Sequence, residues 1–157
     1  MASLYYSVTN PLIGQLASPV AGNIIEYQYK NLDKNREYGV TITVPVTLLK
    51  KWQITNNLLA YQSEMKIKNN RLKQSTLAVK TAHFISLKKL ADIELIAEYR
   101  SRSVNANSIF ASLFYCDVGL SRKIVHNKIR IKIYCSDIAN TLREKEITDY
   151  AGTHIFF

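Results

Sequence analysis

The chain has 157 residues, a formal net charge of +9 and a pI near 9.6, with 47% hydrophobic and 21% charged residues. This composition is that of a folded globular domain, and it excludes a disordered or low-complexity segment. A basic chain of this length favours a polyanionic partner, which is either a nucleic acid or an acidic membrane surface.

The N-terminal region holds much of the turn chemistry, because two prolines and two glycines interrupt residues 11–22. This pattern predicts an irregular N-terminal arm over residues 1–23, followed by a single domain over residues 24–157. The arm is apolar and needs a cover, so we expect it to act in self-association. The residues we assign to that contact are Leu4, Tyr5, Tyr6 and Val8.

The N-terminus does not have the charge pattern of a signal peptide, and no apolar run approaches the roughly 20 residues of a membrane-spanning helix. We therefore expect a soluble, intracellular protein in a reducing compartment. The two cysteines, Cys116 and Cys135, lie in apolar surroundings and are interpreted as free thiols.

Alternation of apolar and polar residues predicts strands over residues 25–30, 38–44, 76–87, 92–100, 109–118 and 124–134. Residues 92–100 also fit a helix, although the strand is favoured. Helical spacing predicts short helices over residues 45–52, 57–68 and 137–145. The expected fold class is α+β, mainly an antiparallel sheet with two or three short helices and the N-terminal arm.

The most informative segment is residues 128–134, where cations and isoleucines alternate. On a strand, Lys128, Arg130 and Lys132 share one face, and we expect the isoleucines between them to be buried on the other. Residues 65–91 and 118–136 contain no acidic residue. The candidate nucleic-acid or membrane-binding residues are Lys66, Lys68, Arg71, Lys73, Lys88, Lys89, Arg122, Lys123, Lys128, Arg130 and Lys132.

Signatures of catalysis are weak. Asp92 and Glu94 share a strand face and could bind a divalent metal, but cross-strand charge pairing with a basic strand is the favoured interpretation. Cysteine and histidine do not cluster with zinc-ligand spacing, so we expect no metal and no cofactor. Trp52 follows a lysine pair, an arrangement found at membrane interfaces, although a core position is favoured for it.

In overall character the chain resembles the small matrix proteins of negative-strand RNA viruses, which self-assemble, contact the nucleocapsid and lie under a membrane. The leading hypothesis is a non-catalytic, self-associating protein that binds RNA, a ribonucleoprotein or an anionic membrane surface. Its expected location is the cytoplasm, or the host cytoplasm or virion if the protein is viral, peripheral to a membrane where that surface is its partner. The alternatives are a metal-dependent nuclease or other small enzyme, and a soluble component of a bacterial assembly.

Overall fold

The computed structural model describes residues 1–21, 24–32, 34–67, 70–87, 90–105, 108–125, 128–150 and 153–156. The described residues form strands, turns and irregular segments, and none of them lies in a helix. The expected α+β fold is therefore wrong, because the chain is all-β. No helix in the described part of the chain is long and apolar enough to cross a membrane.

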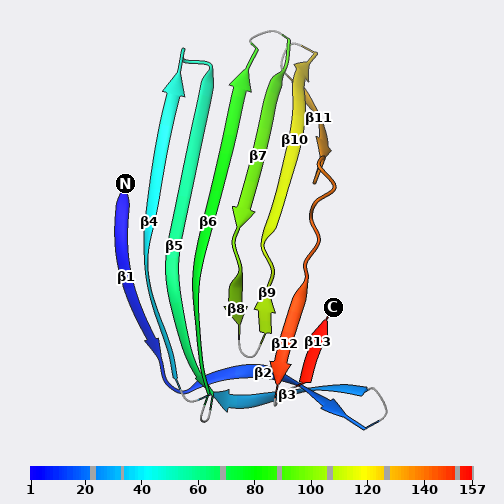
Figure 1. Ribbon diagram of the computed structural model, residues 1–157. Coiled ribbons are helices and arrows are strands. Elements are labelled where there is room, and N and C mark those ends of the chain that lie inside the picture. Colours follow the sequence, from blue (N-terminus) through cyan, green and yellow to red (C-terminus); the bar gives the residue numbers. More distant parts are fainter. Residues whose placement is uncertain are drawn as a thin grey trace.

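A seven-stranded sheet dominates the molecule, with its long strands side by side (Figure 1). Every neighbouring pair in it is antiparallel. In spatial order its strands are β1 (Ala2–Thr9), β4 (Lys34–Leu48), β5 (Trp52–Ile67), β6 (Asn70–Ser86), β7 (Asp92–Arg100), β10 (Leu113–Ile124) and β11 (Ile129–Cys135).

The two ends of this sheet differ. At one end, which we call the turn end, residues 49–51, 87–91 and 125–128 join neighbouring strands directly. At the other, which we call the loop end, smaller strands are added (Figure 1). These are the hairpin of β2 (Leu12–Val20) and β3 (Ile24–Leu32), and a sheet of β8 (Ser103–Asn105), β9 (Ser108–Phe110), β12 (Glu146–Tyr150) and β13 (Thr153–Phe156).

The helix expected at residues 45–52 is instead the end of β4 and a tight turn. The missing N–H of Pro45 does not break the ladder. The amide of Thr43, two residues earlier on the same side of β4, bonds the Met1 carbonyl at the start of the chain, so Pro45 lies beyond the paired part of that edge. Leu49 and Lys50 then adopt positive φ values of 53° and 55° at the centre of a tight turn, in which the Lys51 amide donates to the Leu48 carbonyl at 3.2 Å.

The helices expected at residues 57–68 and 137–145 are also absent. Residues 57–67 continue β5 in register with β4 and β6, so Leu58 and Tyr61 point to opposite faces rather than along one helical stripe. Residues 136–145 form an irregular segment beside β10, in which the Ile138 amide donates to the Cys116 carbonyl at 2.8 Å and Thr141 Oγ1 to the Phe114 carbonyl at 2.8 Å.

The expected irregular N-terminal arm is replaced by regular structure, because Ala2–Thr9 pairs with β4 as an edge strand. Tyr5 lies opposite Gly39, where a Cβ atom would come within 2.9 Å of the Tyr5 ring. The absence of a side chain on Gly39 leaves room for this ring. The domain boundary at residue 23 stays a prediction, and it falls between β2 and β3, which form one hairpin.

Hydrophobic burial is confined to the loop end. Leu16 and Met65 are the buried hydrophobic residues of the described chain, with Leu12 packed against them. Leu12 and Leu16 belong to β2, which crosses the loop end of the sheet, and Met65 to β5 (Figure 1). Apart from Met65, no hydrophobic side chain that the structure describes in the long sheet is fully buried.

Candidate functional site

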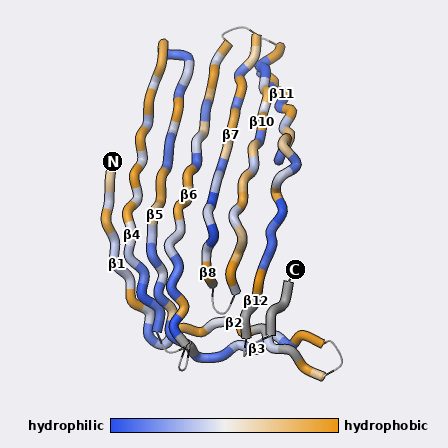
Figure 2. The backbone as a smooth tube through the Cα atoms, in the orientation of Figure 1, coloured by the Kyte–Doolittle hydropathy of each residue, from blue (hydrophilic) through white to orange (hydrophobic). Residues whose placement is uncertain are grey.

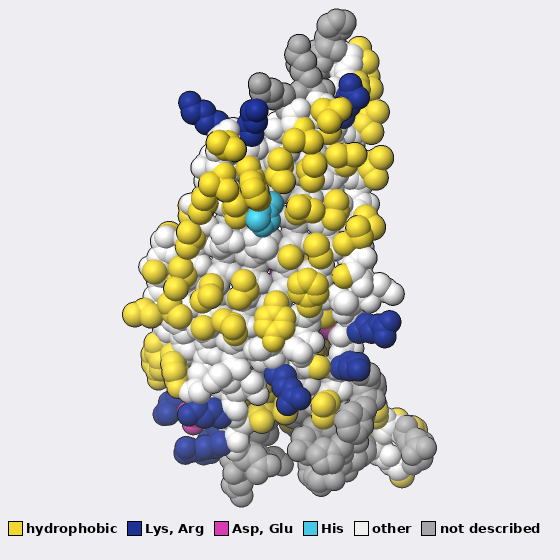
Figure 3. All heavy atoms as spheres, turned by 45° about the horizontal axis from the view of Figure 1, so that its top comes forward, with side chains coloured by type: hydrophobic (Ala, Val, Ile, Leu, Met, Phe, Trp, Pro, Cys, Tyr) yellow, Lys and Arg dark blue, Asp and Glu magenta, His cyan; other side chains and the backbone are white. Residues whose placement is uncertain are grey.

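One face of the seven-stranded sheet carries most of the apolar side chains, and we call it the apolar face. Hydrophobic and hydrophilic residues alternate along the long strands (Figure 2), and the strand register places the hydrophobic ones together. Figure 3 shows them gathered over the middle of this face. They include Leu4, Val40, Ile42, Val44, Val46, Ile54, Leu58, Leu77, Val79, Ile85, Ile93, Leu95, Val118, Leu120, Ile129, Ile131 and Ile133.

These side chains are exposed or half-buried, and none of them is fully covered by the described chain. Leu4 is 85% exposed, Ile133 69% and Ile131 52%. Burying apolar surface releases roughly 25 cal/mol per Å², so an uncovered sheet face of this size is unstable in water. The apolar face therefore requires a hydrophobic cover from outside the chain.

The height of the apolar face matches a lipid bilayer. On β4 it runs from Tyr38 to Leu48, ten residue steps that span about 33 Å along the strand. A strand tilted by about 40° covers roughly 25 Å of that in height, which is the thickness of the apolar band of outer-membrane barrels. Aromatic side chains mark both limits, with Trp52 at the turn end and Tyr38 toward the loop end.

Polar groups within the apolar face satisfy one another. Trp52 Nε1 donates to His83 Nδ1 at 3.1 Å, and His83 Nε2 lies 2.9 Å from Thr81 Oγ1. The Thr81 hydroxyl donates to Asn56 Oδ1 at 2.8 Å. Such closed chains are what a surface that excludes water demands.

The opposite face, which we call the polar face, carries hydrogen-bonded polar side chains. Tyr5 donates to Glu37 at 2.9 Å, and Thr43 donates to Asn57 Oδ1 at 2.9 Å. Farther across the sheet, Glu98 accepts a hydrogen bond from the Tyr115 hydroxyl at 2.8 Å and forms an ion pair with Lys80 at 3.2 Å.

A second polar group lies where β7, β10 and β11 meet. Lys132 Nζ is 2.5 Å from Glu94 Oε2, and Tyr134 donates to Asp117 at 2.6 Å. Lys132 reaches Glu94 across β10 at Gly119, where a Cβ would stand 3.4 Å from both side chains. The favoured charge-pair interpretation is thus confirmed for Glu94, while Asp92 accepts from Ser86 at 2.7 Å. Among the described residues, no group of three His, Cys, Asp or Glu could hold a metal.

The predicted basic residues fall at both ends of the sheet instead of forming one patch (Figure 3). The turn end carries Arg122, Lys123 and Lys128, and the loop end carries Lys66, Arg71 and Lys73. Lys68, Lys88 and Lys89 lie outside the described residues. Sequence reasoning missed Lys34 and Arg36, which pair in register with Lys66 and Glu64, because acidic residues adjoin them in sequence.

The segment forms a strand over Ile129–Cys135, as expected, but neither of its faces is buried. Arg130 and Lys132 lie on the polar face and the three isoleucines on the apolar face, whereas Lys128 precedes the strand. All residues of β11 are exposed, including every isoleucine. The expected burial of those isoleucines is wrong because the alternation came from a sheet whose apolar side has no protein layer against it.

The residues assigned to self-association divide between the faces. Leu4, Tyr6 and Val8 lie on the apolar face of β1, and Tyr5 on the polar face. Their role in self-association stays a prediction.

The sequence model of the outer membrane protein beta-barrel family matches residues 1–156. No curated protein and no solved structure matches the chain. The family match agrees with the uncovered apolar face and with its height.

This match overturns the expected function. A viral matrix protein, an RNA or ribonucleoprotein partner, a peripheral membrane contact and a cytoplasmic location are all wrong, since the family is one of bacterial outer-membrane proteins. The error has one physical origin. Positive charge was interpreted as the binding surface, whereas the surface that dictates location is the apolar one.

Proposed function

Because the chain belongs to the outer membrane protein β-barrel family, we propose that it forms a membrane-embedded wall of a β-barrel in the bacterial outer membrane. The apolar face lies against lipid, and the polar face lines the barrel interior. The function is structural or one of transport, without catalysis.

One observation carries this proposal: the sheet separates its side chains by face, with uncovered hydrophobic residues on one side and bonded polar residues on the other. A soluble sheet with one wet face covers its apolar side with protein. A transmembrane barrel has the reverse need, because lipid covers the apolar side and strand pairing satisfies the backbone.

The connections suggest an orientation. Outer-membrane barrels have short periplasmic turns and longer extracellular loops. The turn end, with connections at residues 49–51, 87–91 and 125–128, is accordingly assigned to the periplasm. The loop end, where the β2–β3 hairpin crosses the sheet, is assigned to the cell exterior (Figure 1).

The absence of catalysis is supported by the state of the carboxylates on the polar face. Glu37, Glu94, Glu98 and Asp117 each accept a hydrogen bond from a tyrosine or a lysine. General acid–base work needs a group that is available to exchange a proton with a substrate. These groups instead link strands of the sheet to one another, as a barrel wall requires.

The test uses two adjacent positions on opposite faces of β4. In a background with Cys116→Ala and Cys135→Ala, Val44→Cys or Thr43→Cys is labelled with a nitroxide, and the full chain is refolded into phospholipid vesicles. Collisions with oxygen, which concentrates in lipid, and with a water-soluble nickel complex are measured by electron paramagnetic resonance.

We expect the label at residue 44 to be reached by oxygen and shielded from nickel. The label at residue 43 should show the opposite preference or be shielded from both, because its side faces the interior. Nickel access at residue 44 that equals or exceeds its oxygen access would mean that the sheet is not embedded, and the proposed function would be refuted.

A further inference from the structure

Along the apolar face toward the loop end, the side chains of β4, β5 and β6 change from apolar to polar and then to basic. Its rows follow from the strand register. Val40, Ala60 and Leu77 form an apolar row, and Tyr38, Gln62 and Ser75 form the next. Two further rows contain Arg36, Glu64 and Lys73, and then Lys34, Lys66 and Arg71. Successive rows are about 7 Å apart along the strands.

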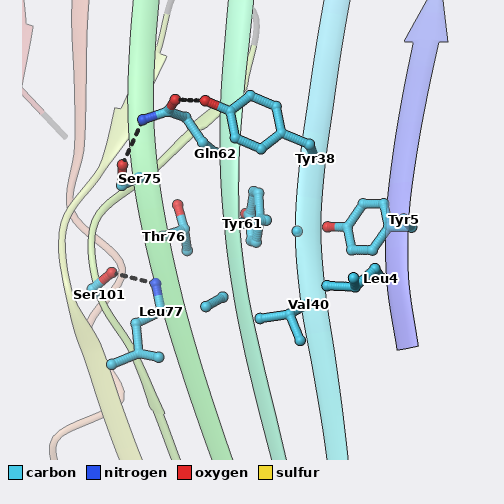
Figure 4. Close-up of a pocket in the computed structure, with 12 residues that line it drawn as sticks. Leu4, Tyr5, Tyr38, Val40, Tyr61, Gln62, Ser75, Thr76, Leu77 and Ser101 are labelled. Atoms are coloured by element: carbon cyan, nitrogen blue, oxygen red, sulfur yellow. Dashed lines mark hydrogen bonds between the residues drawn. The ribbon is translucent and has the colours of Figure 1, made fainter. Parts of the chain in front are cut away.

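The apolar row is hollow. A shallow cavity of about 600 Å³ lies over it, bordered by Leu4 of β1 and by Tyr38 (Figure 4). The hollow arises because Ala60 presents only a methyl group between the larger Val40 and Leu77. A groove of this kind on a lipid-facing wall fits an extended hydrocarbon chain.

The next row forms a polar step at the end of the groove. Tyr38 donates to Gln62, and Gln62 Nε2 donates to Ser75 Oγ at 2.9 Å, so the three side chains form a line across the strands (Figure 4). Tyr38 is 46% exposed. An aromatic ring with a bonded hydroxyl is suited to the boundary between hydrocarbon and headgroups.

Beyond this step the surface becomes strongly basic. A second cavity, of about 60 Å³, is lined by Lys34, Arg36, Glu64, Lys66 and Arg71. Lys73 lies directly opposite Glu64 on β6. The only carboxylate of these two rows is Glu64, which is 3.7 Å from the exposed Arg71 and offsets one positive charge. Lysine and arginine side chains gathered at headgroup level are matched to phosphate.

From this sequence of rows we propose a specific site for a lipid that carries an anionic phosphate headgroup. One acyl chain lies in the groove over Ala60, the glycerol or sugar region meets Tyr38 and Gln62, and the phosphate contacts Arg36 and Lys73. The inference rests on the proposed function, since it requires the apolar face to be in contact with lipid.

The test places a fluorescent probe beside the site without altering it. Tyr6 lies opposite Tyr38 on β1 and does not line the groove, so Tyr6→Trp in a Trp52→Phe background reports on lipid at this place. The protein is refolded into phosphatidylcholine vesicles that contain the same mole fraction of brominated phosphatidylglycerol or of brominated phosphatidylcholine. Bromine quenches tryptophan at short range.

We expect the phosphatidylglycerol to quench the probe more strongly, and the preference to fall about fivefold for each cation removed in Arg36→Gln and Lys73→Gln. Lys50→Gln with Lys51→Gln, at the turn end, is the matched control and should leave the preference unchanged. Ala60→Phe, which fills the groove, should also reduce it, whereas Ala97→Phe on the same face of β7 should not.

The outcomes separate the two proposals. Equal quenching by the two lipids, or a preference that survives both Arg36→Gln and Lys73→Gln, overturns the lipid site and leaves the embedded barrel wall standing. No quenching by either lipid shows that the face does not meet lipid, and this overturns the proposed function together with the site.

Discussion

The apolar and polar faces of the same sheet satisfy their polar groups in different ways. Along β5, Leu58 points to the apolar face and Leu59 to the polar face, although the two residues are identical and adjacent. The apolar face closes its few polar groups among themselves, as in the chain from Trp52 to Asn56, while the polar face uses charged pairs between strands. The comparison teaches that periodicity locates a face, but the surroundings determine what that face contacts.

The largest expected effect comes from placing charge on the two faces. Leu58→Arg should lower the free energy of unfolding by about 2–4 kcal/mol, because residue 58 lies near the middle of the apolar band between Ile42 and Val79. Leu59→Arg should cost much less, because its charge enters the polar side. Urea unfolding in phospholipid vesicles, followed by Trp52 fluorescence, measures both. Equal costs would contradict the assignment of the faces.

The next effect compares the two glycines of the polar face. A Cβ at residue 39 would stand 2.6 Å from the Ala60 carbonyl oxygen, whereas at residue 119 the nearest atom is 3.3 Å away, on the Tyr134 ring. Gly39→Ala should therefore cost about 1–3 kcal/mol, since the backbone must shift. Gly119→Ala should cost clearly less in the same urea titration. A larger cost at residue 119 would show that the β10–β11 region is the tighter one.

A smaller effect concerns the ion pair of the polar face. A double-mutant cycle with Glu94→Gln and Lys132→Met should give a coupling free energy of about 0.5–1 kcal/mol, because both side chains are partly exposed. If the polar face lines water, the coupling free energy should weaken as the salt concentration is raised from about 0.05 M to about 1 M, because the Debye length falls to roughly 3 Å at the higher concentration. A coupling insensitive to salt would place the pair in a dry interior.

The smallest effect tests the turn end. Lys50→Gly should raise the free energy of unfolding by a few tenths of a kcal/mol, up to about 1, because residue 50 has a φ of 55° that glycine adopts without strain. Lys51→Gly is the control and should lower stability, since that residue is not in the left-handed region. Thermal unfolding in detergent micelles is sufficient to rank the two variants.

Much of the strand content could be predicted from the sequence. Residues 92–100 alternate except at Ile96, and β7 begins and ends at those residues. The segment after Lys128 was likewise identified as a strand with the correct faces. Alternation is a local property that survives in any surroundings.

The helices and the location could not be predicted in the same way. Residues 57–68 place Leu58, Tyr61 and Met65 at helical spacing by coincidence, since these side chains serve different faces of β5. The signal for an outer-membrane strand is weak in any one segment and strengthens only over many strands. The site at Arg36 and Lys73 depends on register across β5, which no linear motif records.

The number of strands in the main sheet has a consequence for how a ring can close. Since every neighbouring pair is antiparallel, the first and seventh strands, β1 and β11, run in the same direction. A cylinder sealed by these two edges alone, within one copy or between copies that share one membrane orientation, contains a parallel seam. A cylinder that is antiparallel throughout requires an odd number of additional strands between those edges, and the first of them must run in the direction of β4 and β6.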